Sequence, residues 1–181
     1  MGMTLVEMMF SVGIGSLVCA AALATLLFSL RSFQALTNYQ DLNGKSRLAL
    51  DTLSRDIRQS NGCSTNATFS ASSLTLTGTN VVTLAPYTIT YNYNSTATTL
   101  TRTYTESSAQ ASVLLSNCTY FAFSYFLRNP ANASFDVFSN DSGNAALCKL
   151  VQVDWNCWRS ILGNPVNTQI GESARIVIRK E

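Results

Sequence analysis

Residues 3–31 read MTLVEMMFSVGIGSLVCAAALATLLFSLR, and this stretch decides the fold of the chain. No charged residue occurs from Met8 to Leu30, a run of about the length that one helix needs to cross a bilayer. One acidic residue, Glu7, lies at the front edge of the run, where a carboxylate is costly to bring into lipid. The run is therefore a candidate for a cleaved secretory signal, a membrane anchor, or a helix that packs against copies of itself.

The apolar run passes without a break into residues 31–60, RSFQALTNYQDLNGKSRLALDTLSRDIRQS. A cleaved signal normally ends at a short recognition site before a loop, so this continuity argues against a cleaved signal. The absence of a break at Arg31 also favours one long helix over two separate helices. The SNG stretch at residues 60–62 predicts the end of that helix. Apolar side chains recur in this half at three- and four-residue spacings, as on one helix face: Phe33, Leu36, Leu50, Leu53 and Ile57, flanked by Tyr39, Leu42 and Leu48.

After Gly62 the periodicity changes from helical to alternating, which is typical of strands. Residues 87–94 and 98–105 predict a hairpin with a polar turn at residues 94–96, and residues 113–127 predict one further strand. The remaining strand candidates are residues 72–78, 81–85, 135–140, 147–155 and 174–180. An antiparallel sheet needs an apolar layer to cover it, and the amphipathic half of the helix is the expected cover. The predicted fold class is α+β.

Five cysteines occur in the chain: Cys19, Cys63, Cys118, Cys148 and Cys157. Cys19 lies in the apolar run, where a thiol behaves as a small hydrophobic group. The other four form an even set in a polar, exported portion, and they predict two disulfides. Three connectivities are possible; Cys148 and Cys157 are close enough in sequence to close a short loop, which would leave Cys63 with Cys118. A zinc site is the rival interpretation, but no Cys-x-x-Cys pair and no histidine support it.

Composition argues against most enzyme classes and against nucleic acid as a direct partner. The chain has no histidine and only 10 acidic residues, so the commonest general base and metal ligand is missing. A net charge of +2 is too small to indicate nucleic-acid binding. We therefore expect no catalytic residues, no metal and no cofactor. If the chain were nevertheless an enzyme, a serine–lysine or paired-carboxylate mechanism would be the alternative that its composition allows.

The residues G-M-T-L-V-E followed by an uncharged helix resemble the N-terminal motif of type IV prepilins. Residues 48–60 and the strands at 87–105 and 114–126 resemble the minor pilins of the PilW/PulJ type and the J-type pseudopilins of type II secretion. The resemblance implies a type IV pilin-like fold. It also implies cleavage by a prepilin peptidase between Gly2 and Met3, with methylation of the new N-terminus at Met3. Glu7 would then pair with the free amine of Met3 in a neighbouring subunit and set the axial register of a filament.

The resemblance also implies a division of the chain and a cellular setting. Residues 1–2 would be a leader remnant, 3–30 a transmembrane and filament-core helix, 31–60 its amphipathic continuation, and 61–181 a β-rich head. The expected partners are other pilin or pseudopilin subunits, the prepilin peptidase, an inner-membrane assembly platform and, before assembly, the lipid bilayer. The chain would cross the inner membrane once, with its head in the periplasm or outside the cell, and later enter a filament. The expected function is to prime or tip the assembly of a type IV pilus or a type II secretion pseudopilus.

Several alternatives stay open from sequence alone. The chain could be a major pilin that forms the filament body, or a membrane-anchored adhesin or binding protein that never polymerises. Glu7 could simply stabilise the start of its helix through the helix dipole, by about 0.3–1 kcal/mol. Trp155 and Trp158 around Cys157 suit an exposed contact surface as well as half-buried positions that stabilise a loop.

Overall fold

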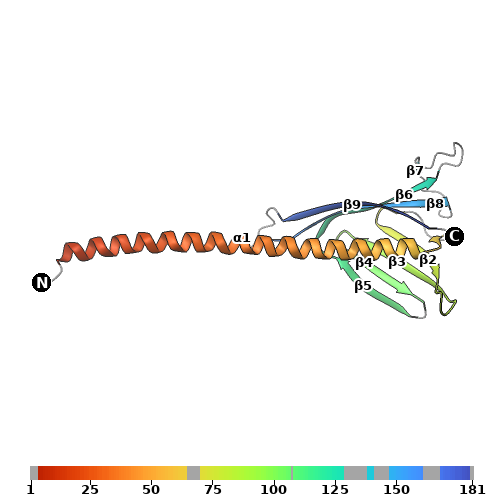
Figure 1. The fold of residues 1–181 in the computed structure, drawn as a ribbon, viewed down its shortest axis with the longest axis horizontal. Coiled ribbons are helices and arrows are strands. Elements are labelled where there is room, and N and C mark those ends of the chain that lie inside the picture. Colours follow the sequence, from red (N-terminus) through yellow and green to blue (C-terminus); the bar gives the residue numbers. More distant parts are fainter. Residues whose placement is uncertain are drawn as a thin grey trace.

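The computed structural model describes residues 4–64, 70–106, 108–128, 138–140, 147–160 and 168–179. One helix, α1 (Leu5–Gln59), contains 55 residues and is about 80 Å long at 1.5 Å per residue. Thr4 caps its start, and the backbone N–H of Ser60 donates to the carbonyl of Asp56 at its end. The helix runs through Arg31 and Gly44 without interruption, which confirms the prediction of one continuous helix ending near residue 60. Its N-terminal half projects away from the rest of the protein (Figure 1).

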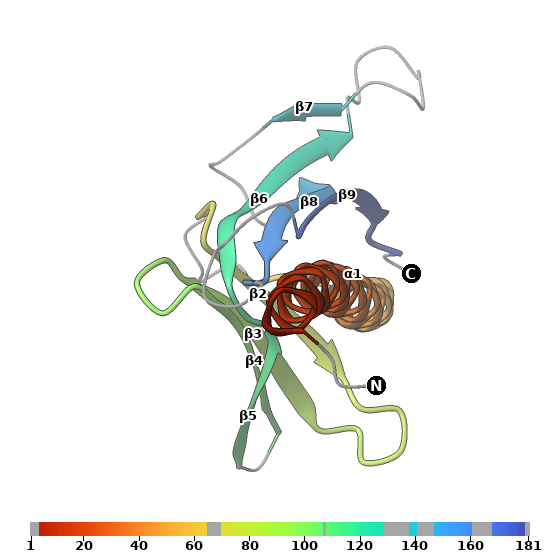
Figure 2. The same cartoon turned by 90° about the vertical axis from the view of Figure 1, so that its left-hand side faces the viewer.

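The strands form two antiparallel sheets rather than the single sheet that the sequence suggests. The five-stranded sheet has the order β1-β2-β3-β4-β5, and the four-stranded sheet has the order β7-β6-β8-β9. Viewed along the helix, the C-terminal part of α1 lies in the angle between the two sheets, against β9 on one side and β2 and β5 on the other (Figure 2). The strands are β1 (Gly62–Cys63), β2 (Ser73–Thr79), β3 (Pro86–Asn94), β4 (Thr99–Thr105), β5 (Ala109–Leu115), β6 (Cys118–Arg128), β7 (Phe138–Asn140), β8 (Cys148–Trp158) and β9 (Gln169–Val177).

The hairpin predicted at residues 87–105 is confirmed, whereas two other strand predictions are wrong. β3 and β4 pair in continuous register from Thr88↔Thr105 to Asn94↔Thr99. The strand predicted at residues 113–127 is instead two strands in different sheets, because Asn117 adopts φ +57° and turns the chain between β5 and β6. That left-handed position is one that asparagine tolerates better than most residues.

The strand predicted at residues 81–85 is a turn. The side chain of Asn80 accepts hydrogen bonds from the backbone N–H groups of Val82 at 2.9 Å and Thr83 at 3.3 Å. This local bonding offers the backbone an alternative to a ladder, and it wins over the strand propensity of Val81 and Val82. Leu84 then adopts φ +53° as the chain turns back into β3.

A single core joins the helix to both sheets. The residues of α1 that are buried in it recur at spacings of four and three from Leu42 to Asp56, with Ile57 next to Asp56: Leu42, Ser46, Ala49, Leu53, Asp56 and Ile57. On the sheet side, Phe121, Phe123 and Tyr125 of β6 are buried in the core, and Tyr120 just before them is exposed. The predicted apolar stripe is therefore correct at Leu53 and Ile57 but wrong at its front end, because Phe33 and Leu36 lie before the head and remain 66% and 57% exposed.

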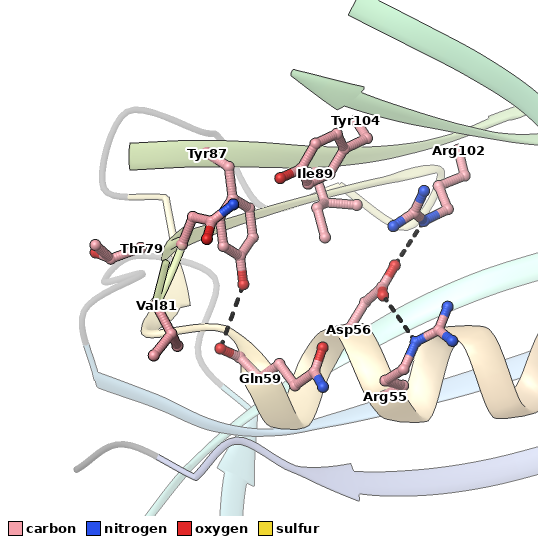
Figure 3. Close-up of a pocket in the computed structure, with 10 residues that line it drawn as sticks. Arg55, Asp56, Gln59, Thr79, Val81, Tyr87, Ile89, Arg102 and Tyr104 are labelled. Carbon is pink, nitrogen blue, oxygen red and sulfur yellow. Dashed lines mark hydrogen bonds and ion pairs between the residues drawn. The ribbon is translucent and has the colours of Figure 1, made fainter. Parts of the chain in front are cut away.

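Two polar contacts fix the helix in this core. Asp56, only 3% exposed, accepts a hydrogen bond at 2.6 Å from the hydroxyl of Tyr91. It accepts another at 2.6 Å from Nε of Arg102 (Figure 3). The indole N–H of Trp155 donates to the hydroxyl of Ser46 at 2.8 Å. Trp155 is 2% exposed and stacks on Phe121, so the interpretation of this tryptophan as an exposed contact surface is wrong. Both sheets thus supply directional contacts to the buried part of the helix.

Replacing Asp56 with asparagine tests the contribution of the buried carboxylate. We expect Asp56→Asn to lower the free energy of unfolding by about 2–4 kcal/mol, because Arg102 loses its countercharge while its guanidinium stays largely buried. Urea unfolding of the full chain in detergent, followed by tryptophan fluorescence, measures this change.

The matched control is Asp51→Asn, the same substitution at an exposed position of the same helix. We expect it to change the free energy of unfolding by no more than about 0.5 kcal/mol. Equal losses in the two variants would show that Asp56 contributes only a surface charge.

Candidate functional site

The N-terminal half of α1 presents apolar side chains on every face and to no other part of the described structure. Every residue from 4 to 34 is exposed. The large apolar side chains among them are Leu5, Val6, Met8, Met9, Phe10, Val12, Ile14, Leu17, Val18, Leu23, Leu26, Leu27, Phe28, Leu30 and Phe33. By length and composition α1 is the one described helix that can cross a membrane. A helix that is apolar all round needs a buried environment, which is either lipid or other protein.

Three hydroxyl groups in this half donate to carbonyl groups of the helix itself. Ser11 donates to the carbonyl of Glu7, and Ser16 to that of Gly13, each at 2.8 Å. Thr25 in the same way donates to the carbonyl of Ala22 at 2.8 Å. Because these donors already have acceptors, the outer surface of the half demands little hydrogen bonding from its surroundings. Such a surface suits both a hydrocarbon environment and a packed bundle of helices.

The contact between helix and head begins with a small group of polar residues. The side-chain amide of Asn38 donates to the carbonyl of Ser160 at 3.1 Å. Asp41 forms ion pairs with Arg159 of the head and, at 3.4 Å, with Lys45 one helical turn later. These residues separate the apolar half from the buried helix face that starts at Leu42. The helix therefore changes from an uncovered apolar rod to a docked amphipathic helix between residues 31 and 42.

Glu7 closes a capping box with Thr4 at the start of α1. Its Oε2 accepts from the backbone N–H of Thr4 at 2.9 Å and from the Thr4 hydroxyl at 3.0 Å. In return, the backbone N–H of Glu7 donates to the Thr4 hydroxyl at 3.4 Å. This arrangement satisfies donors that a helix start otherwise leaves free. The sequence signal for it was present as Thr-x-x-Glu, and reasoning from the helix dipole alone missed it.

The capping box leaves part of the Glu7 carboxylate available. Both contacts with Thr4 use Oε2, and within the described residues Oε1 accepts no hydrogen bond. A carboxylate has room for several donors, so Glu7 can cap its own helix and still accept from an amine of another chain. Gly2 and Met3, the predicted cleavage and methylation positions, lie outside the described residues. The pairing of Glu7 with an amine therefore stays a prediction.

The four cysteines of the head are arranged as two neighbouring pairs. Cys118 and Cys157 form a disulfide between β6 and β8. This bond rules out the connectivity in which Cys148 pairs with Cys157 and leaves Cys63 to Cys118. The favoured sequence argument failed because a short sequence separation placed Cys148 and Cys157 in one extended strand, at opposite ends of β8. Cys63 and Cys148 are buried thiols, and Cys19 is exposed on the apolar half of α1.

A cleft of about 460 Å³ opens beside the end of α1, between the helix and strands β3 and β4 (Figure 3). Its polar walls are occupied by contacts that hold the head to the helix, including Tyr87, whose hydroxyl donates to the carbonyl of Gln59. Burial, and then the nearby Asp56 carboxylate, raise the pKa of Tyr87 and, further still, that of Tyr91. Both tyrosines therefore stay protonated as hydrogen-bond donors. Burial opposes protonation of Arg102, but its bond to Asp56 prevails and raises its pKa.

The cleft is thus a structural joint. Within the described part of the chain, no cluster of three or more histidine, cysteine, aspartate or glutamate side chains could hold a metal ion. In contrast, the apolar half of α1, with Glu7 at its start, packs against no other described part of the chain. We therefore take this half as the candidate functional site.

Comparison with known proteins adds no relative from which a role could be transferred. No family model matches the chain, and neither a curated protein nor a solved structure is significantly similar to it.

Proposed function

We propose that this chain is a minor subunit of a type IV pilus or of a type II secretion pseudopilus, and that it primes or tips the assembly of the filament. The carrying observation is the uncovered apolar half of α1, continuous with a docked helix and opened by a single carboxylate at Glu7. In this proposal the same surface is covered by lipid before assembly and by like helices afterwards. The head remains outside the bilayer throughout, and the protein has no catalytic role.

The geometry of the helix supports the sequence of environments in this proposal. Residues 5–30 span about 39 Å as a helix, which exceeds the roughly 30 Å hydrocarbon core of a bilayer. The head starts only near Leu42, so a polar segment of the helix separates it from the membrane surface. A helix bundle needs the same separation between the head and the apolar half, because neighbouring helices can pack against that half only where no head blocks them.

Glu7 provides the register in this proposal. Apolar contacts alone do not fix the axial position of α1, because contacts between apolar surfaces change little when one helix slides along another. An ion pair between Oε1 of Glu7 and the N-terminal amine of a neighbour fixes one axial offset. Cleavage after Gly2 would expose that amine on Met3, in the chain segment next to the carboxylate.

A series of substitutions separates the charge of Glu7 from its capping function. We expect Glu7→Gln to abolish incorporation into filaments or to reduce it at least about 10-fold, because glutamine keeps hydrogen-bond acceptors for Thr4 but has no charge to pair with an amine. The measurement is the ratio of assembled to membrane-bound protein, from immunoblots of sheared filaments and membrane fractions.

The matched control is Thr4→Ala, which removes the cap and retains the carboxylate. We expect this variant to assemble within about 2-fold of the unmodified chain, since the loss of one cap costs about 1 kcal/mol in a helix of this length. Normal assembly of Glu7→Gln would contradict the proposal and favour a membrane-anchored adhesin or binding protein. A defect in Thr4→Ala equal to that in Glu7→Gln would reduce Glu7 to a helix cap.

The number of copies in a filament distinguishes a minor from a major subunit. We expect quantitative mass spectrometry of purified filaments to find this chain at no more than about one copy per hundred of the most abundant subunit, because a priming or tip position is occupied once per filament. A chain that accounts for most of the filament mass would identify a major pilin. This result would overturn the minor role and leave the assembly role of the apolar helix intact.

A further inference from the structure

Cys63 and Cys148 lie together in the core although they are far apart in sequence. Cys63 belongs to β1, immediately after α1, and Cys148 is the first residue of β8 in the other sheet. Both residues are buried, at 5% and 3% exposed, and their two strands are in contact. The two thiols are near enough for each to shift the pKa of the other. The hydroxyl of Tyr125, which donates to the carbonyl of Ser73 at 2.6 Å, lies close to both sulfur atoms.

The contact between the two buried thiols makes them chemically unequal. Interaction with the Cys63 thiol lowers the pKa of Cys148. The same interaction, together with burial, raises the pKa of Cys63. Cys148 therefore ionises first, and the thiolate is the species that attacks a disulfide in thiol–disulfide exchange.

The position of the pair mirrors that of the existing disulfide. Cys118 lies opposite Cys157 at one end of the β6–β8 ladder, and Cys148 lies opposite Leu127 at the other end. A chain that keeps the Cys118–Cys157 bond folds in a compartment that supplies disulfides. Cys63 and Cys148 meet in the same core as that disulfide, so during folding they encounter the same oxidising compartment.

We infer that Cys63 and Cys148 form a second disulfide, which joins the end of α1 and the five-stranded sheet to the four-stranded sheet. In the first step the Cys148 thiolate attacks the disulfide of a protein or of a small molecule, forming a mixed disulfide and releasing one thiolate of the oxidant. In the second step the Cys63 thiol loses its proton, and its thiolate attacks the Cys148 sulfur of the mixed disulfide and releases the second thiolate of the oxidant. The chain gives up two protons and two electrons, and the disulfide of the oxidant is reduced to two thiols.

The bond would give the two sheets a second covalent connection. The polypeptide passes directly from the five-stranded to the four-stranded sheet at residues 116 and 117, beside Cys118. A Cys63–Cys148 bond adds a covalent connection at the opposite end of β6 and anchors the chain just after the helix ends. This inference does not depend on the proposed function, because it concerns the head of the protein in any role.

Peptide mapping of the full chain tests the pairing directly. Trypsin places the four head cysteines in four different peptides, 59–102, 103–128, 129–149 and 150–159. Protein exported to an oxidising compartment is denatured without reductant, blocked with N-ethylmaleimide, and digested. We expect one blocked cysteine, Cys19, and two linked pairs, 59–102 with 129–149 and 103–128 with 150–159. The same pattern is expected after refolding of reduced protein with oxidised glutathione.

Blocking of three cysteines, with 103–128 linked to 150–159 as the only pair, would overturn the inference, as would any link from 59–102 to a peptide other than 129–149. Neither outcome affects the Glu7 experiments, so the two proposals fail separately. A second measurement uses the thermal midpoint of unfolding in detergent. We expect Cys63→Ala/Cys148→Ala to lower it by roughly 5–15 °C without reductant, and Cys19→Ala, the matched control, to leave it unchanged.

Discussion

Residues 5–30 of α1 expose apolar side chains around the whole circumference of the helix, and no described part of the head reaches them. Apolar surface costs roughly 25 cal/mol for each Å² left in water, so a segment of this size cannot remain uncovered in solution. This constraint determines the rest of the molecule. It requires a second surface from outside the chain and keeps the head at the far end of the helix. It also favours hydroxyl groups that bond within the helix, as those of Ser11, Ser16 and Thr25 do.

The docked part of α1 depends on polar contacts as well as on apolar burial. Leu53 and Ile57 are fully buried, but two apolar surfaces permit the helix to slide by one turn at small cost. Asp56 and Ser46 remove that freedom, because Asp56 accepts from Arg102 and Tyr91 in one sheet and Ser46 accepts from Trp155 in the other. A shifted helix would leave a buried carboxylate and a buried indole N–H without partners. The free-energy cost of either loss is larger than the change in apolar contact energy that the shift produces.

Sequence patterns predicted the parts of the fold that are governed by local periodicity. The continuous helix, its end near residue 60 and the β3–β4 hairpin all follow from spacings visible in the chain. The failures occurred where a specific side chain overrides periodicity. Asn80 and Asn117 turn the backbone within apolar or alternating stretches, and Ser46 and Asp56 belong to the buried helix face although they are polar. The front of the predicted stripe, Phe33 and Leu36, failed because sequence cannot show where along a helix a distant head begins.

For the candidate site, the position of Glu7 at the start of the apolar run follows from the sequence, and the Thr-x-x-Glu pattern already contained its capping box with Thr4. The pairing of the cysteines could not be predicted, because it depends on which strands of two sheets meet. Cys118 meets Cys157 through the β6–β8 ladder, and Cys63 lies near Cys148 because β1, just after the helix, contacts β8 of the other sheet.

The environment of the apolar half is measured most directly by comparing two exposed leucines of α1, Leu17 and Leu48, which are 72% and 65% exposed. A spin label is attached to Leu17→Cys or Leu48→Cys in a Cys19→Ala background, and the full chain is placed in lipid nanodiscs. We expect oxygen, which concentrates in lipid, to relax the label at position 17, and a water-soluble nickel chelate to relax only the label at position 48. Equal relaxation of both labels by the nickel chelate would contradict the account, because the apolar half of α1 would then lie in water.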